Sequence, residues 1–193
     1  MVGLDTLVYA GSHGFDITGP GGLHLQHEEA IQRLPALDAA EQTLRARLAH
    51  IAGALVERKR FAIAVHYRLA VDQDVGTVTG TVAEVHRQHA SLRQQDGKMI
   101  VELQPDVAWD KGRAVLWLRE TLGVARPEVV TLYIGDDTTD EDAFRALAEH
   151  GLGLGIIVAA SVSATRARYS LRTCDEVQQF LSVLLEMLQR QRH

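Results

Sequence analysis

The stretch YIGDDTTDEDAF, residues 133–144, gathers acidic side chains directly after an apolar run. That run, VVTLYI at 129–134, is continuous, which is typical of a parallel strand buried on both faces of a sheet. Ligands of open α/β sheets lie beyond the carboxyl ends of the strands. The pattern therefore predicts that Asp136 and Asp137 stand at the ligand-binding edge of such a sheet.

The residues alone allow two interpretations of this acidic cluster. In the first, Thr139 caps the following helix with Asp142 as its capping-box partner, and the helix dipole attracts the other charges. Capping does not account for Asp136 and Asp137, which precede the helix. Neighbouring carboxylates at a strand end suit a hard cation such as Mg²⁺, held by one or two carboxylates with phosphate oxygen and water. The sequence favours the metal site.

The second half of the chain alternates helices with apolar strands. The pattern predicts helices over 111–122, 140–150 and 175–190, and strands over 129–134 and 153–159. Continuous apolar strands between helices indicate a parallel sheet covered on both sides. The last helix is predicted to turn one face to the core, formed by Val177, Phe180, Leu181, Leu184, Leu185 and Leu188.

The middle of the chain has a different pattern, and Gly/Pro-rich stretches at 18–23 and 104–112 bound it. It predicts an amphipathic helix over 38–52, strands in ALVERK and FAIAVHYRLA, a second helix, and a hairpin turning at Asp96-Gly97. We therefore expect residues 21–105 to form an α+β unit. It is inserted into an α/β core made of 1–20 and 106–193.

Composition limits the classes of partner. The chain has 193 residues, 46% hydrophobic and 23% charged, as in ordinary globular proteins. A net charge of −5 argues against nucleic acid or anionic membrane as a partner. The single cysteine, Cys174, suits a reducing compartment. No secretory signal or membrane-spanning stretch is recognisable, so the expected location is cytoplasmic.

The acidic stretch resembles the fourth motif of the haloacid-dehalogenase-type phosphatases, and its GDD-x-TDE form with a following Phe resembles their trehalose-phosphatase branch. The resemblance implies a haloacid-dehalogenase-like (HAD-like) Rossmannoid α/β core with an inserted α+β cap. It also implies Mg²⁺-dependent hydrolysis of trehalose 6-phosphate in trehalose biosynthesis. Other stretches that resemble the family in the same order are LVYAGSHGFDI, ALVERKRFAIAVHYR, MIVELQP, WDKGRAV and TRARYSL.

The resemblance assigns catalytic roles near the acidic stretch. Asp136 would be the direct Mg²⁺ ligand, while Asp137 and Asp140 would hold metal-bound water or orient the loop. Lys111 would neutralise the phosphoryl group, which fits a reaction catalysed mainly by positioning and charge stabilisation. The alternative to this functional role is that Lys111 is an ordinary solvated lysine at the start of a helix.

The resemblance makes the inserted unit a cap that closes over a disaccharide. Family members grip sugar hydroxyls with a Glu-x-Lys pair and a glutamate before a proline, which match Glu57, Lys59 and Glu102. Positions two apart on a strand share a face, although such a pair is otherwise more often a surface salt bridge. The remaining expected substrate contacts are Ser12, His13 and Arg68, and Arg68 would meet phosphate or support the cap sheet.

The family's nucleophile motif, Asp-x-Asp-Gly-Thr, does not occur in these 193 residues. In the family its first aspartate attacks phosphorus, and its second protonates the leaving oxygen and then activates water. The core is thus expected to lack its first strands, and the chain alone is expected to be inactive and poorly stable. We expect a fragment, a late-started reading frame, a decayed copy, or a piece completed by a missing N-terminal segment or partner polypeptide.

Two other functions stay open. One is a related sugar-phosphate phosphatase, such as a sucrose-phosphate enzyme. The other is a non-catalytic module that binds a sugar phosphate, or the degenerate half of a fusion enzyme. The retained acidic, lysine and Glu-x-Lys residues argue against long decay.

Overall fold

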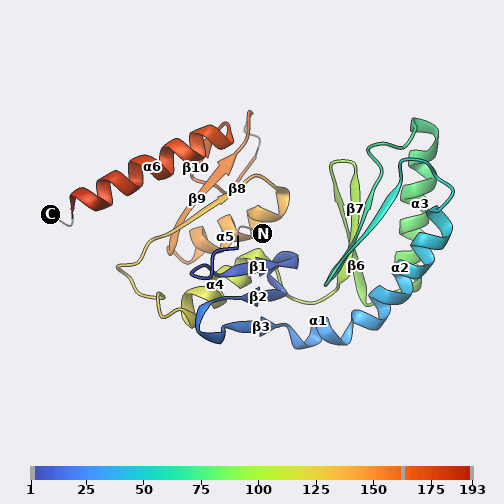
Figure 1. Ribbon diagram of the computed structural model, residues 1–193, viewed down its shortest axis with the longest axis horizontal. Helices are drawn as coiled ribbons and strands as arrows, with labels where there is room; N and C mark the ends of the chain where they lie inside the picture. The colour runs from blue at the N-terminus through green and yellow to red at the C-terminus, as the bar shows by residue number, and fades with distance from the viewer. Residues whose placement is uncertain (1–2, 162–163, 192–193) are drawn as a thin grey trace. The chain divides into compact units, whose positions relative to one another are not determined.

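The computed structural model describes residues 3–161 and 164–191. The chain divides into two compact units, Met1–Ala108 and Trp109–His193 (Figure 1). The first contains β1 (Tyr9–Gly11), η1 (Ser12–Gly14), β2 (Asp16–Thr18), η2 (Pro20–Gly22), β3 (His24–Gln26), α1 (Glu28–Gln32), α2 (Leu34–Leu48), β4 (Leu55–Lys59), β5 (Ala62–His66), α3 (Asp72–Gln88), β6 (Leu92–Gly97) and β7 (Ile100–Pro105). The second contains α4 (Lys111–Thr121), β8 (Thr131–Gly135), η3 (Thr138–Asp140), α5 (Glu141–Glu149), β9 (Gly153–Val158), β10 (Tyr169–Leu171) and α6 (Cys174–Arg190).

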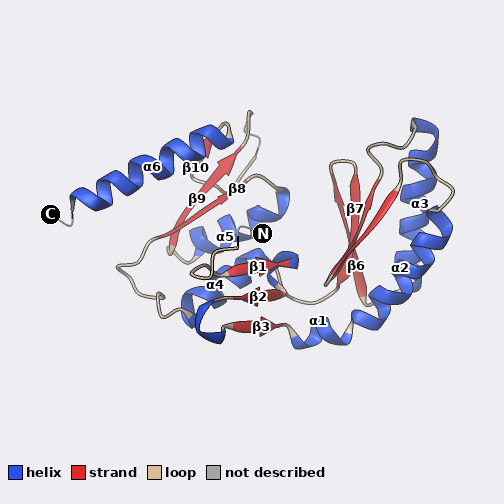
Figure 2. Ribbon diagram, in the orientation of Figure 1, coloured by secondary structure: helices blue, strands red, loops and turns tan. Residues whose placement is uncertain are grey.

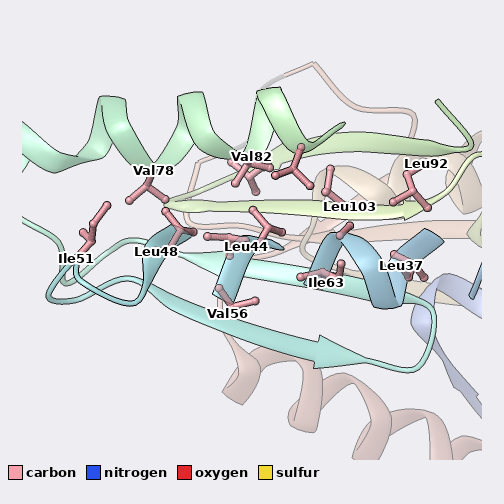
Figure 3. Packing of buried hydrophobic residues seen from close by; sticks show 14 residues of the cluster. Leu37, Leu44, Leu48, Ile51, Val56, Ile63, Val78, Val82, Leu92 and Leu103 are labelled. Carbon is pink, nitrogen blue, oxygen red and sulfur yellow. The ribbon is translucent and has the colours of Figure 1, made fainter. Parts of the chain in front are cut away.

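The larger part of the first unit is a four-stranded antiparallel sheet in the order β4-β5-β7-β6. Helices α2 and α3 pack on one face of it, as Figure 2 shows. Alternate residues of the strands, such as Val56, Ile63 and Leu103, point into this core, where they meet Leu44 and Val82 of the helices (Figure 3). The other residues of each strand lie on the opposite face, which the two helices leave open.

The sequence located these elements well. The predicted first helix of this region corresponds to α2 and its flanking turn, and its predicted core residues Leu37, Leu44, Leu48 and Ile51 are all buried. The predicted hairpin exists, but the predicted turn is wrong by two residues. Gly97 pairs with Ile100, so the turn falls on Lys98 and Met99, and Met99 adopts a φ of +63°. The cross-strand register, rather than the Asp-Gly pair, sets the turn.

A small antiparallel sheet, β1-β2-β3, opens the first unit. The sequence predicted that the first strand would join the α/β layer, but β1 pairs with β2 in the described chain. Two fully buried side chains, Phe15 and Ile17, fix this sheet, and the Phe15 ring lies 5.7 Å from the Phe61 ring at the end of β4 and β5. The assignment of residues 1–20 to the core stays a prediction.

The second unit has a parallel sheet in the order β10-β9-β8. Helices α4 and α5 pack together, and α5 buries Ala143, Phe144 and Leu147. The sequence predicted both helices and both central strands within about two residues of their bounds, because long apolar runs between helices leave few alternatives.

The prediction that helix α6 turns one face to the core is wrong. The helix forms at the predicted position, yet none of its described residues is buried. Leu181, Leu185 and Leu188 of its predicted core face are about half exposed, at 48%, 56% and 51%. Its apolar stripe is real, but α6 lies beside the short strand β10, which is too small to cover it (Figure 1). Within the described residues, no helix combines the length and apolarity needed to cross a membrane.

Candidate functional site

The acidic stretch forms a tight loop at the carboxyl end of β8. The strand ends at Gly135, a 3-10 turn follows over Thr138–Asp140, and α5 begins at Glu141. A Cβ atom on Gly135 would lie 2.4 Å from the carboxyl carbon of Asp140. Glycine is therefore required here for close approach, since it lets the Asp140 carboxylate fold back against the strand end.

Asp140 is the hub of this loop. Its Oδ1 accepts hydrogen bonds from Lys111 Nζ at 2.7 Å and from the Tyr133 hydroxyl at 2.8 Å. Its Oδ2 accepts the backbone N–H groups of Asp136 at 3.0 Å and Asp137 at 2.9 Å. The side chain is only 6% exposed, so four donors stabilise a carboxylate that is nearly removed from water.

Burial and hydrogen bonding oppose each other in the pKa of Asp140. Burial raises this pKa, but the Lys111 ammonium, the Asp137 amide and the Tyr133 hydroxyl together hold it below its ordinary value. Burial also raises the pKa of Tyr133 well above its usual range, and the neighbouring Asp140 carboxylate raises it further. Near neutral pH the loop therefore contains an ionised Asp140 beside a neutral phenol.

The expected helix cap is wrong by two residues. The capping box uses Asp137, which accepts from the Thr138 N–H, and Asp140, which accepts from the Asp137 N–H. The physical reason is the 3-10 turn, which moves the start of helical structure ahead of Thr139. Asp142 instead pairs with Arg145 at 2.8 Å. Capping thus accounts for Asp137 and Asp140, whereas it leaves Asp136 unexplained.

Asp136 is exposed, and its carboxylate has no hydrogen-bond or ion-pair partner among residues 3–161 and 164–191. With Asp137 and Thr165 it lines a pocket of about 190 Å³. Glu141 fixes the far wall, because its carboxylate accepts from the Thr165 hydroxyl and from the Arg166 N–H at 2.7 Å. Both oxygens of the Glu141 carboxylate are therefore occupied by hydrogen bonds to residues 165 and 166.

The donor set fits a hard cation only in part. The described residues contain no group of three or more His, Cys, Asp or Glu side chains placed to hold a metal ion. The free carboxylate of Asp136 is nonetheless the kind of oxygen ligand that Mg²⁺ takes singly or in pairs, with water and phosphate completing its shell. Among the acidic residues of the loop, Asp136 is the one whose carboxylate makes no hydrogen bond or ion pair within the described chain.

Lys111 opens helix α4, which Asp110 caps by accepting from the Arg113 N–H at 2.8 Å. A Cβ atom on Gly112 would meet the Asp142 carbonyl oxygen at 2.4 Å. This close contact between α4 and α5 brings the Lys111 ammonium onto Asp140. The ammonium of Lys111 therefore pairs with Asp140 of the acidic loop, so Lys111 is not simply a solvated lysine at a helix start.

The open face of the four-stranded sheet carries the other predicted residues. Glu102 accepts from Lys59 Nζ at 2.7 Å and contacts His13 Nε2 at 3.1 Å. The hydrogen bond from His13 lowers the pKa of Glu102 to about 2, against the effect of burial and with help from Lys59. Glu102 is thus a well-held anion.

Glu57 and Lys59 share this face, as their spacing predicts, but they have different partners. Glu57 contacts His66 Nε2 at 2.8 Å. Arg68 lies beyond them, where its guanidinium approaches the Lys98 carbonyl oxygen at 3.5 Å. Glu57, His66 and Arg68 line one pocket at this end of the sheet. The face therefore carries two polar clusters.

Ser12 and His13 lie in the η1 turn after β1. The Ser12 carbonyl accepts from the Phe15 N–H at 3.2 Å, and the His13 ring reaches Glu102. The structure thus brings His13, Lys59 and Glu102 together in the first unit, and Lys111, Asp136, Asp137 and Asp140 together in the second.

Known proteins share this architecture. A haloacid dehalogenase-like hydrolase from Bacteroides thetaiotaomicron superposes with a TM-score of 0.56 over 85% of this chain and 70% of its own, at 14% identity. The molecule accordingly has the HAD-like α/β fold. Residues 1–175 match the trehalose-phosphatase family model, so the chain belongs to the trehalose-phosphatase family.

Individual relatives agree with this membership. Trehalose 6-phosphate phosphatase RA3 of Zea mays is 39% identical over 197 residues, which cover 95% of this chain and 55% of that protein. The trehalose-phosphate phosphatase of Mycobacterium tuberculosis strain H37Rv is 42% identical over 175 residues, or 90% and 44%. The crystal structure of a trehalose-6-phosphate phosphatase related protein has a TM-score of 0.75 at 25% identity, over 94% and 72%. The chain spans about half the length of the curated relatives it matches.

Sequence reasoning did not single out Tyr133, Glu141 or His66 for the contacts they make. Tyr133 offered one usable signal, since a tyrosine in a buried strand needs a partner for its hydroxyl. Glu141 had been ascribed to helix-dipole attraction, and nothing in the sequence links it to Thr165.

Proposed function

We propose that this chain carries part of the site for Mg²⁺-dependent hydrolysis of trehalose 6-phosphate to trehalose and phosphate. One observation supports this most strongly. In a member of the trehalose-phosphatase family, a lysine is held on a buried aspartate at a strand end, beside a free carboxylate. That is an arrangement suited to phosphoryl transfer, where most of the catalysis is charge stabilisation.

In the second unit, Asp136 would hold Mg²⁺, and Lys111 would face the phosphoryl oxygens. The bound cation would neutralise charge on the transferred phosphoryl group. Lys111 supplies a second positive charge at the same place. Asp140 orients the lysine, and Asp137 holds the shape of the loop through its cap. These two aspartates would hold metal-bound water or orient the loop.

On the open sheet face, Glu57, Lys59 and Glu102 would bind sugar hydroxyls. Carboxylates accept from hydroxyls and an ammonium donates to them, so the face offers both kinds of partner to a polyol. Arg68 is exposed and cationic, which suits the charged end of a sugar phosphate. Ser12 and His13 complete the set of proposed substrate-binding residues.

The nucleophile and the general acid would come from a segment outside these 193 residues, or from another polypeptide that carries Asp-x-Asp-Gly-Thr. A carboxylate nucleophile forms an aspartyl-phosphate, which water then hydrolyses. Without it, Lys111 and Asp136 can bind a phosphate ester, but they cannot cleave it. This chain alone is therefore expected to bind trehalose 6-phosphate without turnover.

We also propose that residues 21–105 act as the cap and that 1–20 and 106–193 belong to the core. Support comes from the four-stranded sheet and its two helices, which form within the proposed cap, and from the parallel sheet of the second unit, whereas the pairing of β2 with β3 crosses the proposed boundary. The single cysteine and the composition favour a cytoplasmic location.

Isothermal titration of the chain with trehalose 6-phosphate and Mg²⁺ tests the binding part. Asp136→Asn is expected to abolish the Mg²⁺-dependent gain in affinity. Glu149→Gln removes one negative charge from the exposed end of α5 and serves as the matched control. Equal binding by wild type and Asp136→Asn would refute the proposed cation site.

A longer protein with an Asp-x-Asp-Gly-Thr strand upstream of residue 1 tests the reaction. It should release phosphate from trehalose 6-phosphate faster than from sucrose 6-phosphate or glucose 6-phosphate. Faster release from another sugar phosphate would show that the proposed substrate is wrong. Tight binding of trehalose 6-phosphate with no turnover would favour a non-catalytic, regulatory module.

A further inference from the structure

Three consecutive residues after β1 have a left-handed backbone. The φ angles are +47° at Ser12, +59° at His13 and +87° at Gly14. Glycine tolerates this region, but side chains of L-residues crowd the backbone there, so two neighbouring non-glycine residues are uncommon. Such conformations persist where the surroundings impose them, and they concentrate at functional sites.

The surroundings hold this turn from its carboxyl side. Phe15 is fully buried and packs against the rings of Phe61 and His27, at 5.7 and 5.9 Å. Asp16 accepts from the Arg60 guanidinium at 3.0 Å. Arg60 and Phe61 both lie in the connection between β4 and β5, so the turn is tied to one end of the four-stranded sheet.

The result of the turn is the contact between the His13 ring and Glu102. The pKa of Glu102 is about 2, so its carboxylate is ionised near neutral pH and His13 Nε2 must donate the hydrogen bond to Oε2. Oε1 takes the Lys59 ammonium. The two partners differ in access to water, since the His13 side chain is 16% exposed and Lys59 is 40% exposed.

We propose that His13 is a positioning residue, which fixes the Glu102 carboxylate so that Oε1 and the Lys59 ammonium remain available to sugar hydroxyls. The strained turn serves to bring the imidazole to this point. The His13 ring, which is mostly buried, thus contributes to substrate binding through Glu102. This inference rests on the proposed function for the role of Glu102 as a sugar-binding group.

The physical reason lies in the geometry of a free carboxylate beside an ammonium. Without His13, Glu102 could turn both oxygens toward Lys59, and a sugar hydroxyl would then compete with the full ion pair. With Oε2 held by the imidazole, a sugar displaces only the more exposed lysine contact. The ammonium can in turn donate to the sugar oxygens.

His13→Gly removes the ring and relaxes the backbone at the same position. His13→Gln is the conservative variant, because its amide N–H reaches about as far as Nε2. Met99→Gly is the matched control for relaxed backbone, since Met99 also has a left-handed φ of +63° in this unit. Each variant is titrated with trehalose and with trehalose 6-phosphate, and its thermal unfolding is recorded.

We expect His13→Gly to bind trehalose about tenfold more weakly, as for loss of a charge-assisted hydrogen bond, while a cooperative unfolding transition shows that it still folds. His13→Gln should recover most of the affinity, and Met99→Gly serves as the control for the unfolding transition and for the pKa of Glu102. Affinity of His13→Gly within twofold of wild type would overturn the inference.

A measurement without ligand separates this inference from the proposed function. Carboxyl ¹³C shifts followed through a pH titration give the pKa of Glu102 in each variant. It should rise toward its ordinary value in His13→Gly and stay low in Met99→Gly, and no rise in His13→Gly refutes the positioning role. If wild type binds neither sugar, the proposed function fails, and with it the role in sugar binding, while the pKa comparison still decides whether His13 fixes Glu102.

Discussion

Two lysine–carboxylate pairs invite comparison, one in each unit. Lys111 meets Asp140 and Lys59 meets Glu102, both at 2.7 Å. In the second unit the other carboxylate oxygen takes two backbone N–H groups, whereas in the first it takes the imidazole of His13. The same chemical pair is thus fixed once by main chain and once by a side chain.

The difference shows how sequence distance affects rigidity. All partners of Asp140 except Lys111 come from the stretch 133–140, while Glu102 is held by residues far away along the chain. Backbone donors cannot change rotamer, so the Asp140 hub is expected to be stiff. Glu102 depends on side chains, and one of them, Lys59, is substantially exposed. We therefore expect substitutions around Asp140 to cost more stability than substitutions around Glu102.

Gly135→Ala should have the largest effect. The added Cβ would overlap the Asp140 carboxylate and break a buried, charged hub, at a cost of about 3–5 kcal/mol in the free energy of unfolding. Trp109 and Trp117 both lie in the second unit, so tryptophan fluorescence in urea measures this loss. Gly80→Ala in α3, where a Cβ meets nothing within 4 Å, is the control and should stabilise the protein by about 0.5–1 kcal/mol. A mild effect of Gly135→Ala would mean that the hub can rearrange.

Lys111→Met and Lys59→Met compare the two pairs directly. Lys111→Met leaves a buried carboxylate without its counter-charge and should cost about 2–3 kcal/mol. Lys59→Met should cost about 1 kcal/mol or less, because the lysine is exposed and His13 still holds Glu102. Urea unfolding followed by circular dichroism measures both. Equal losses would remove the proposed difference in rigidity.

Acid should reveal the Glu102 cluster. The pKa of Glu102 is about 2 in the folded protein against 4.5 ordinarily, so its stabilisation is complete above pH 4.5 and is lost as pH falls toward 2. Allowing for the exposed Lys59, the contribution is about 2 kcal/mol. The free-energy difference between wild type and Glu102→Gln should shrink by that amount between pH 6 and pH 2. A difference independent of pH would contradict the cluster.

Tyr133→Phe should have a small effect, about 1 kcal/mol, because Asp140 Oδ1 keeps the lysine when the hydroxyl is lost. Tyr9→Phe is the control, since its hydroxyl meets only exposed main chain of Leu4 and its removal should cost less than about 0.5 kcal/mol. Thermal unfolding resolves the two. A loss above that of Lys111→Met would make the phenol the main support of the hub.

The sequence predicted the parts whose causes are local. A continuous apolar run forms β8, and the elements on either side follow from helical spacing. The predicted cap was two residues too late because a 3-10 turn and the start of a longer helix have almost the same residue preferences. The prediction that one face of α6 is buried in the core was wrong for another reason. Periodicity shows that a stripe is apolar, but it does not show that another element covers it.

The candidate site residues also differ in whether local sequence could bring them together. Asp136, Asp137 and Asp140 are adjacent in sequence, and strand geometry alone brings them to one edge. His13, Lys59 and Glu102 meet only through a cross-strand register and a left-handed turn, neither of which residue spacing encodes. The resemblance to a family named those three residues, and the structure adds that they form one cluster. Tyr133 was missed because its contact depends on how sharply the chain turns after Gly135.

The capping box has a consequence for how the acidic loop would meet an ion. Asp137 and Asp140 set the loop's conformation with the protein's own N–H groups, so its geometry is preorganised before any cation arrives. A zinc finger, in contrast, folds only when its ion binds. Treatment with a chelator should therefore leave this chain folded and lower its unfolding midpoint only by the free energy of binding the cation, which would act on an already rigid scaffold.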